Sequence, residues 1–311
     1  MSFIYNASAV ALGGSLVLPS QTIIPSQASV ALAPTGGEGR ETVRDYNYNG
    51  IITFDEASVY VTGSQDGTVH NTLSTVSIKN LNVLNVLHVD LLFGSITSRH
   101  EKGAKEGEIT FQGTSVDNLR IAGRRIDPRF NHSFYSRYPT HAAMAAGLND
   151  NVATCGCPEV KLWFEEEVNK ERDAAIANGV TFDETQCRAN LSSGNVASLI
   201  ADRFCWQRGE SVADAPDGLI HCSLADDVPG IEEITADKEN GMSPEELRQH
   251  HPIRRHGYIV KVAGFGTITL AEIIIKPGER RLNMFRLNLG CPITGDMTVG
   301  SASTNGTELI P

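Results

Sequence analysis

Residues 50–135 alternate apolar and polar side chains with a period of two, which is the period of a β-strand. In the segment IITFDEASVYVTG, residues 51–63, Ala57, Val59 and Val61 fall on one face, and Ser58, Tyr60 and Thr62 fall on the other. A strand with one apolar and one polar face packs the apolar face on a core. The pattern therefore predicts a β-sheet with a buried face.

The next segment, NLNVLNVLHVDLLFGSIT at residues 80–97, carries apolar residues on both alternating faces near its centre. Such a pattern is typical of a central strand that is covered on both sides. We therefore expect a single buried strand here.

A seven-residue phrase occurs twice, as SIKNLNV at residues 77–83 and as SVDNLRI at residues 115–121. The period of two is broken within each copy, at Asn80 and at Asn118. One residue of slip sends every later side chain to the opposite face unless a bulge or turn absorbs it. Because Asn tolerates left-handed backbone conformations, we expect a face switch at each Asn, with Leu81 and Leu119 in equivalent core positions. A recognition role for these Asn side chains is the less favoured alternative.

The remainder of the chain changes character twice. We expect an N-terminal strand extension over residues 1–48, a first part of a β domain over 49–138, a helical, acidic insertion with cysteines over 139–256, and a second β part over 257–311. The last segment is too short to bury a core alone and is expected to join the sheets of the first part. The predicted fold is mainly β with an inserted helical region (α+β), an antiparallel β-sandwich or barrel-like sheet system that is discontinuous in sequence.

Helix signals are clearest in the insertion. PEVKLWFEEEVNKERDAAIANG has Pro158 in its first turn and Gly179 at its end, and SPEELRQHHP offers a capping box formed by Ser243 and Glu246. A third helix is expected over residues 193–206. Trp163 and Trp206 fall on these helices and are expected to fill a small core.

Charge is unevenly distributed along the chain. The net charge is −11, and residues 150–246 alone hold 21 Asp and Glu against 7 Lys and Arg. An acidic surface repels phosphate backbones, so we do not expect nucleic acid as a partner. No run near twenty apolar residues is present, so no membrane span is expected. The N-terminus lacks a basic segment before its apolar stretch, which leaves the compartment undetermined, with the cytoplasm as default and non-classical export as alternative.

Cysteines supply the most specific candidate site. Cys155, Cys157, Cys205 and Cys222 could complete a tetrahedral zinc site, and His221 lies beside the last of them. Only one residue separates the first two, whereas paired zinc ligands usually have two or more between them. Free thiols or disulfides are therefore favoured over a metal site.

Two further clusters could bind ions. The segment HHPIRRH, residues 250–256, is interpreted as a solvated helix end, with an anion or an acidic surface as the alternative ligand. The acidic turns at residues 214–218 and 225–230 could hold calcium, but neither follows the Asp-x-Asp-x-Asp pattern. Solvated loops are favoured, and no cofactor is expected.

The segments G-x-S-x-G and H-E-x-x-H are missing, as are phosphate-binding glycine loops. This favours a non-enzymatic structural or assembly protein, a β-rich subunit that self-associates or docks to a protein partner through its N-terminal strands. The alternatives are a carbohydrate- or surface-binding β module, with Tyr135 and Tyr138 as stacking candidates, and a hydrolase with its site where the insertion meets the β domain.

Overall fold

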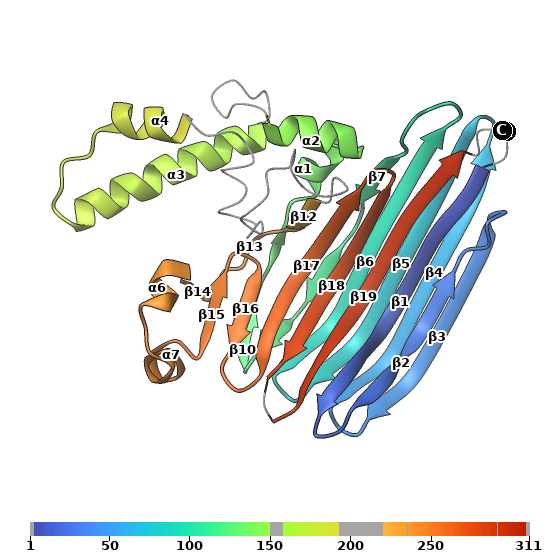
Figure 1. Cartoon of the computed structure of the whole chain (residues 1–311), viewed down its shortest axis with the longest axis horizontal. Coiled ribbons are helices and arrows are strands. Elements are labelled where there is room, and N and C mark those ends of the chain that lie inside the picture. Colours follow the sequence, from blue (N-terminus) through green and yellow to red (C-terminus); the bar gives the residue numbers. More distant parts are fainter. Residues whose placement is uncertain (1–2, 150–157, 193–219, 235, 291, 309–311) are drawn as a thin grey trace.

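Two large antiparallel sheets stacked face to face form the body of the protein in a computed structural model (Figure 1). The structure describes residues 3–149, 158–192, 220–234, 236–290 and 292–308. The fold is mainly β, with a few helices, and is sandwich-like. This confirms the predicted fold class.

The first sheet has nine strands and joins the two ends of the chain. Its order is β14 (Glu232–Glu233), β15 (Ile253–His256), β16 (Ile259–Val262), β17 (Gly266–Lys276), β18 (Glu279–Leu289), β19 (Thr294–Glu308), β1 (Phe3–Leu18) and β2 (Thr22–Ala31). The ninth strand, β12 (Ile220–Ser223), pairs with the C-terminal half of β17. All pairs are antiparallel except β14 with β15.

The second sheet has eight strands, all from residues 37–126. Its order is β10 (Arg124–Ile126), β9 (Leu119–Ile121), β6 (Leu87–Glu101), β5 (Val69–Val83), β4 (Ile52–Asp66) and β3 (Gly37–Tyr48), with β7 (Glu108–Phe111) and β8 (Ser115–Asp117) also paired to β6. A short third sheet joins β11 (Arg129–Phe130) to β13 (Ala225–Asp227).

The two large sheets share one hydrophobic core. β1 packs over β4 and β5, β19 over β5 and β6, and β18 over β6. The buried cluster draws alternate residues from both sheets, as expected for aligned sheet packing. Inside it, the hydroxyls of Thr72, Ser98 and Thr304 hydrogen-bond to one another, so three buried polar side chains satisfy each other between the sheets.

Residues 1–48 are part of both sheets, which differs from the extension expected from the sequence. β1 lies between β19 and β2, and its pairing with β19 runs from Phe3, opposite Glu308, to Leu18. β3 forms an edge of the second sheet. The long-range pairing of β1 with β19 could not be read from the local strand pattern, because it joins segments from opposite ends of the chain.

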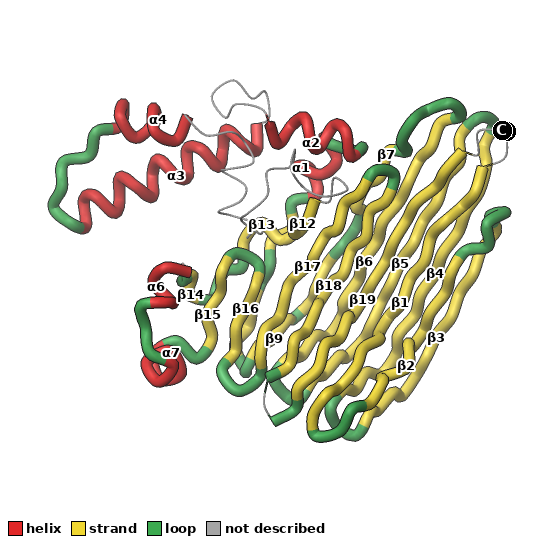
Figure 2. The backbone as a smooth tube through the Cα atoms, viewed as in Figure 1, coloured by secondary structure: helices red, strands yellow, loops and turns green. Residues whose placement is uncertain are grey.

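The helices lie beyond one end and one edge of the sheets (Figure 2). Within the described residues they are α1 (His132–Arg137), α2 (His141–Asn149), α3 (Pro158–Ala177), α4 (Glu184–Ser192), α6 (Ala236–Asn240) and α7 (Pro244–His250). The expected capping box is present at α7, where Ser243 and Glu246 each accept a hydrogen bond from the other's backbone. The helix expected over residues 193–206 lies outside the described residues, while β12 to β15 tie residues 139–256 into the sheets.

The expected face switches in the repeated phrase are confirmed. Asn80 and Asn118 have left-handed backbone angles, with φ of 52° and 50°. Leu81 and Leu119, which follow them, are buried at 1% and 0% exposure. Before Asn80 the buried side chains of β5 are even-numbered, and after it they are odd-numbered. Each Asn therefore reverses the pleat without leaving the sheet.

The reversal is shared by β3, β4, β5 and β6 and by the junction of β8 and β9. The strand registers place Asp45, Asp55, Asn80, Asp90 and Asn118 opposite one another in a transverse line, which we call the reversal row. Asp45 also has a left-handed backbone, with φ of 54°, so every second member of the row carries this conformation. Asn80 Nδ2 donates to Asp55 Oδ2 at 2.6 Å, and Asn118 Nδ2 donates to Asp90 Oδ2 at 2.9 Å.

The nine-stranded sheet has a matching line. Ala28, Ala11, Gly300, Met284 and Ala271 lie opposite one another across β2, β1, β19, β18 and β17. Here too every second residue is left-handed, with φ of 45° at Ala28, 67° at Gly300 and 45° at Ala271. A Cβ at Gly300 would lie 2.7 Å from Leu92 Cδ2 of the opposite sheet, so close packing as well as φ requires glycine there.

The expectation of one strand over residues 80–97 was wrong. A turn at residues 84–86 divides the segment between β5 and β6. Leu84 and Asn85 both have positive φ, 51° and 54°, which is the conformation of the two-residue turns that fit twisted hairpins. The apolar residues on both faces arose from a hairpin and a face switch, not from a strand covered on both sides.

Replacing Asn80 with valine should lower the free energy of unfolding by roughly 1–3 kcal/mol, because a β-branched residue is strained at positive φ. Asn80→Gly should lose less, since glycine adopts this conformation freely. Chemical denaturation checks both, with Ser77→Val on the same strand as the control. If Asn80→Val were as stable as Ser77→Val, the conformation would not be needed for folding.

Candidate functional site

The predicted zinc ligands fall largely outside the described residues. Cys155, Cys157 and Cys205 lie there, and only Cys222 can be placed. Cys222 is a free, buried thiol on β12, and burial raises its pKa to about 12 even though Tyr135 and Arg280 act to lower it. Across the described part of the chain, no group of three or more His, Cys, Asp or Glu side chains is arranged to hold a metal ion.

The acidic turns are only partly described. Residues 214–218 lie outside the described part of the chain. In the other turn, Asp227 accepts a hydrogen bond from the Val228 backbone at 2.8 Å and lies 3.6 Å from Arg255. Its carboxylate is therefore engaged by protein groups. The solvated loop favoured by the sequence and its calcium-binding alternative both stay untested at this turn.

The basic cluster at residues 250–256 contacts acidic residues of the same chain. Arg254 and Lys261 each lie 2.7 Å from Glu239, and Arg255 lies 3.0 Å from Glu233. His251 Nδ1 is 2.7 Å from a carboxylate oxygen of Glu232. Only His250 and His251 lie at the expected helix end, because Arg254 and Arg255 are on β15 and pair with carboxylates of the same chain.

The two tyrosines considered for ligand stacking are part of the core. Tyr135 is 0% exposed, and its hydroxyl donates to the Ser223 carbonyl at 2.5 Å. Tyr138 packs against the same core, with its ring 5.2 Å from that of Phe134. Tyr135 therefore presents no face to a ligand, and Tyr138 is only partly exposed, so these positions give little support to a carbohydrate site.

A polar cluster lies on the outer face of the nine-stranded sheet, where β12, β17 and β18 meet. Glu272 of β17 is 1% exposed, which is unusual for a carboxylate. His221 Nε2 lies 2.7 Å from Glu272 Oε1, and Asn283 Nδ2 donates to Glu272 Oε2 at 2.7 Å. Arg286 completes the cluster with a hydrogen bond of 3.1 Å to Oε1.

The positions follow from strand register. Glu272 is opposite both Ser223 and Asn283, and the left-handed residue Ala271 turns the acidic side chain away from the core. Sequence reasoning singled out His221 but not Glu272. The available signal was a lone carboxylate within the apolar strand ITLAEIII.

Electrostatics hold this carboxylate in its charged form. Burial by itself raises the pKa of Glu272, but hydrogen bonds from His221 and Asn283, together with the charges of His221 and Arg286, outweigh it and lower the pKa to about 2. Asn283 Oδ1 is buried and has no hydrogen-bond partner among the described residues, whereas the His221 side chain is 26% exposed. A histidine oriented by a buried carboxylate can accept or donate a proton at its exposed edge.

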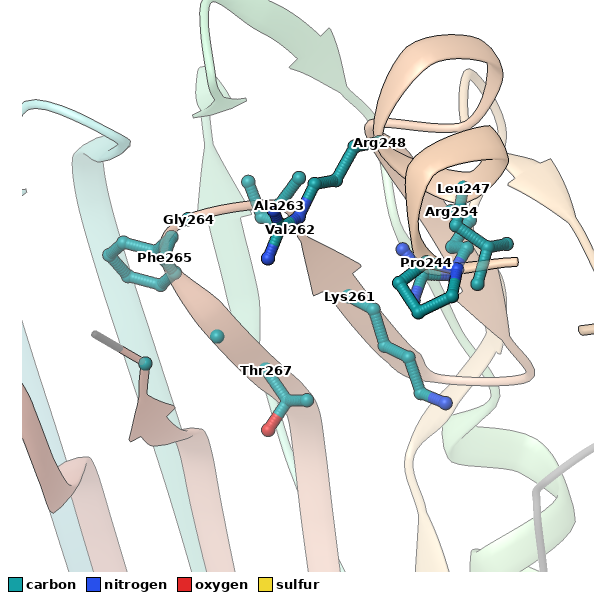
Figure 3. A pocket seen from close by; sticks show the side chains of 12 residues that line it. Pro244, Leu247, Arg248, Arg254, Lys261, Val262, Ala263, Gly264, Phe265 and Thr267 are labelled. Atoms are coloured by element: carbon teal, nitrogen blue, oxygen red, sulfur yellow. The ribbon is translucent and has the colours of Figure 1, made fainter. Parts of the chain in front are cut away.

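Three hollows of the described surface lie away from this cluster. One of about 390 Å³ separates α7 from the turn between β16 and β17 (Figure 3). Pro244, Leu247 and Arg248 line it from α7, and Val262 and Phe265 line the opposite side. Two further hollows are on the outer face of the eight-stranded sheet, one of about 390 Å³ and one of about 200 Å³.

The low pKa of Glu272 makes stability depend on pH. The folded pKa, about 2, lies below the ordinary value of 4.5, so the stabilisation is present above pH 4.5 and is lost as pH falls toward 2. The full loss is about 3 kcal/mol, of which about 2 kcal/mol is expected between pH 5 and pH 3. Urea unfolding at pH 5 and pH 3 should show a smaller pH effect in Glu272→Gln than in the wild type. Equal pH effects in both proteins would contradict this assignment.

No helix in the described part of the chain combines the length and apolarity needed to span a membrane.

Comparison with known proteins gives one match. The chain matches no curated protein and no solved structure. Residues 3–276 match the model of a family described as "Domain of unknown function (DUF8256)", a span that covers β1 through β17. The chain therefore belongs to this family.

Proposed function

We propose that this protein is a non-enzymatic structural subunit that self-associates through the end of its β1–β2 hairpin. The observation that carries the proposal is an apolar patch at that end, which we call the hairpin tip. Its residues are Val17, Leu18 and Ile23, exposed by 57%, 46% and 76%. Large aliphatic side chains in water favour association, because burying them gains about 25 cal/mol per Å².

Strand register brings two of these side chains onto one surface. Ile23 is opposite Ser15 in the β1–β2 ladder, and Val17 follows Ser15 on the same face two residues later. Diagonal neighbours in an antiparallel pair are about 7–8 Å apart, which large side chains can span. The tip therefore offers a small continuous apolar surface that a second copy can cover with its own tip about a two-fold axis.

The adjoining sheet edges favour the tip over strand addition as the contact. The backbone N–H of Ser29, on edge strand β2, donates to Glu41 Oε2 at 2.7 Å, so β3 already occupies this donor. Pro25 interrupts the same edge. Edge strand β3 carries exposed Glu38, Arg40 and Arg44. Charges and proline on edge strands oppose edge-to-edge pairing.

The test compares a variant of the hairpin tip with a control variant that loses exposed apolar side chains elsewhere. In sedimentation velocity the wild type should form dimers or larger species whose fraction rises with concentration. The variant Val17→Ser/Leu18→Ser/Ile23→Ser should be monomeric. Because the net charge is −11, added salt should strengthen association of the wild type by screening repulsion between copies.

The control is Leu162→Ser/Ile176→Ser on α3, where the native side chains are 59% and 67% exposed. It should associate like the wild type. A wild type that is monomeric at high concentration contradicts the proposal. So does a tip variant that still associates, or a loss of association in the α3 control alone.

A hydrolase is the second candidate, because His221 and Glu272 lie where the insertion joins the nine-stranded sheet. Its general base would be His221, held by the buried carboxylate at 2.7 Å. Cys222 is the neighbouring thiol, but burial raises its pKa to about 12, which opposes a role as nucleophile. Ester or peptide hydrolysis that is lost in His221→Ala would favour this candidate over a purely structural role.

A further inference from the structure

The outer face of the eight-stranded sheet carries hydroxyl and amide side chains in ordered rows. On the side of the reversal row toward β7, one row contains Thr62, Leu73, Thr97 and Thr110, and the next contains Ser64, Asn71, Arg99 and Glu108. Neighbouring strands are about 4.8 Å apart, so each row presents polar groups at regular intervals. Most of these side chains are small, and the face is hollowed rather than filled.

Two hollows lie next to each other on this face. The larger, of about 390 Å³, is lined by both rows and by Gln112. The smaller, of about 200 Å³, is lined by Arg40, Ser58, Tyr60, Thr75 and Ser77. Tyr60 and Thr62 are successive outward residues of β4, so the two hollows adjoin along the strand. A volume of 390 Å³ falls within the range of about 300–1,000 Å³ that is typical of small-molecule sites.

Several polar groups in the larger hollow are available to a ligand. The side chains of Ser64, Asn71 and Gln112 make no hydrogen bond within the described part of the chain. Thr97 and Thr110 share one hydrogen bond of 2.9 Å between their hydroxyls, which leaves each with capacity for another. Hydroxyls and amides both donate and accept, and this dual capacity matches the hydroxyl groups of a sugar.

Charge narrows the choice of ligand. Arg99 and Glu108 are the charged residues that line the larger hollow, and they lie 3.7 Å apart as an ion pair. Their charges cancel, so the larger hollow attracts neither phosphates nor carboxylates strongly. Among the described residues, Arg40 is the one charged residue that lines the smaller hollow, and a sulfated probe tests whether its charge decides the ligand. Leu73 supplies an apolar floor, and the Tyr60 ring, whose hydroxyl donates to Glu38 at 3.2 Å, borders the smaller hollow. Apolar carbons beside polar groups match the two kinds of surface on a sugar ring.

We propose that this face binds a neutral oligosaccharide, which lies along β4 and β5 and crosses both hollows. The site is separate from the hairpin tip, so it adds a ligand to the proposed structural role and does not depend on that role. Tyr60 and Leu73 contact the apolar face of the sugar rings, and Ser64, Asn71 and Gln112 bind their hydroxyl groups.

The test is calorimetric titration of the full chain with cellohexaose, maltohexaose and chitohexaose, and with a sulfated heparin hexasaccharide as a charged probe. At least one neutral hexasaccharide should bind, and its affinity should be insensitive to salt. The variant Ser64→Ala/Asn71→Ala/Gln112→Ala should bind it about tenfold more weakly or not at all. All three positions lie on the surface or near it, so the substitutions should leave folding intact.

The matched control is Ser136→Ala/Asn288→Ala/Gln249→Ala, which removes the same three residue types from exposed positions outside both the hollows and the hairpin tip. It should bind like the wild type. The proposal is overturned if no neutral hexasaccharide binds, if both triple variants bind equally, or if only the sulfated probe binds and added salt abolishes it. Running the same titration on the hairpin-tip variant separates failure of this site from failure of self-association.

Discussion

The two rows of pleat reversal constrain the whole sandwich. Each long strand exchanges its inward and outward faces at one level, so every strand in a sheet must do so at that level or turn polar side chains into the core. The structure meets this requirement with left-handed residues on every second strand of both sheets. For residues other than glycine this conformation costs roughly 1–2 kcal/mol each. Asn and Asp lower that cost in one sheet, whereas Ala28 and Ala271 carry it in the other.

The alternation of apolar residues between odd and even positions was the most informative feature of the sequence. It predicted the face switches at Asn80 and Asn118, because a break in a two-residue period has only a few physical explanations. The capping box at Ser243 and Glu246 could also be predicted, since it depends on residues three positions apart. The face switch at Ala271 was missed because alanine carries no local preference for left-handed backbone.

Sequence reasoning failed where the outcome depends on distant pairing. The hairpin at Leu84 and Asn85 was missed because leucine is uncommon at positive φ. Of the candidate site, His221 could be named from the sequence, but its partner Glu272 is 51 residues away and meets it only through the β12–β17 pairing. The basic cluster was understood only in part. The sequence shows the acidic residues Glu233 and Glu239, but it does not show that they lie beside the cluster in the fold.

The position of β1 has a consequence for synthesis of the chain. One side of β1 pairs with β2 almost at once, but the other side must wait for β19, nearly 300 residues later. At ~5–20 residues per second, that delay is about 15–60 s. The waiting strand contains the run NASAVALGGS, rich in Ala, Ser and Gly, which have weak strand preference. A nascent edge of this composition is a poor template for other strands, so the chain limits misassembly during the interval in which its first sheet is incomplete.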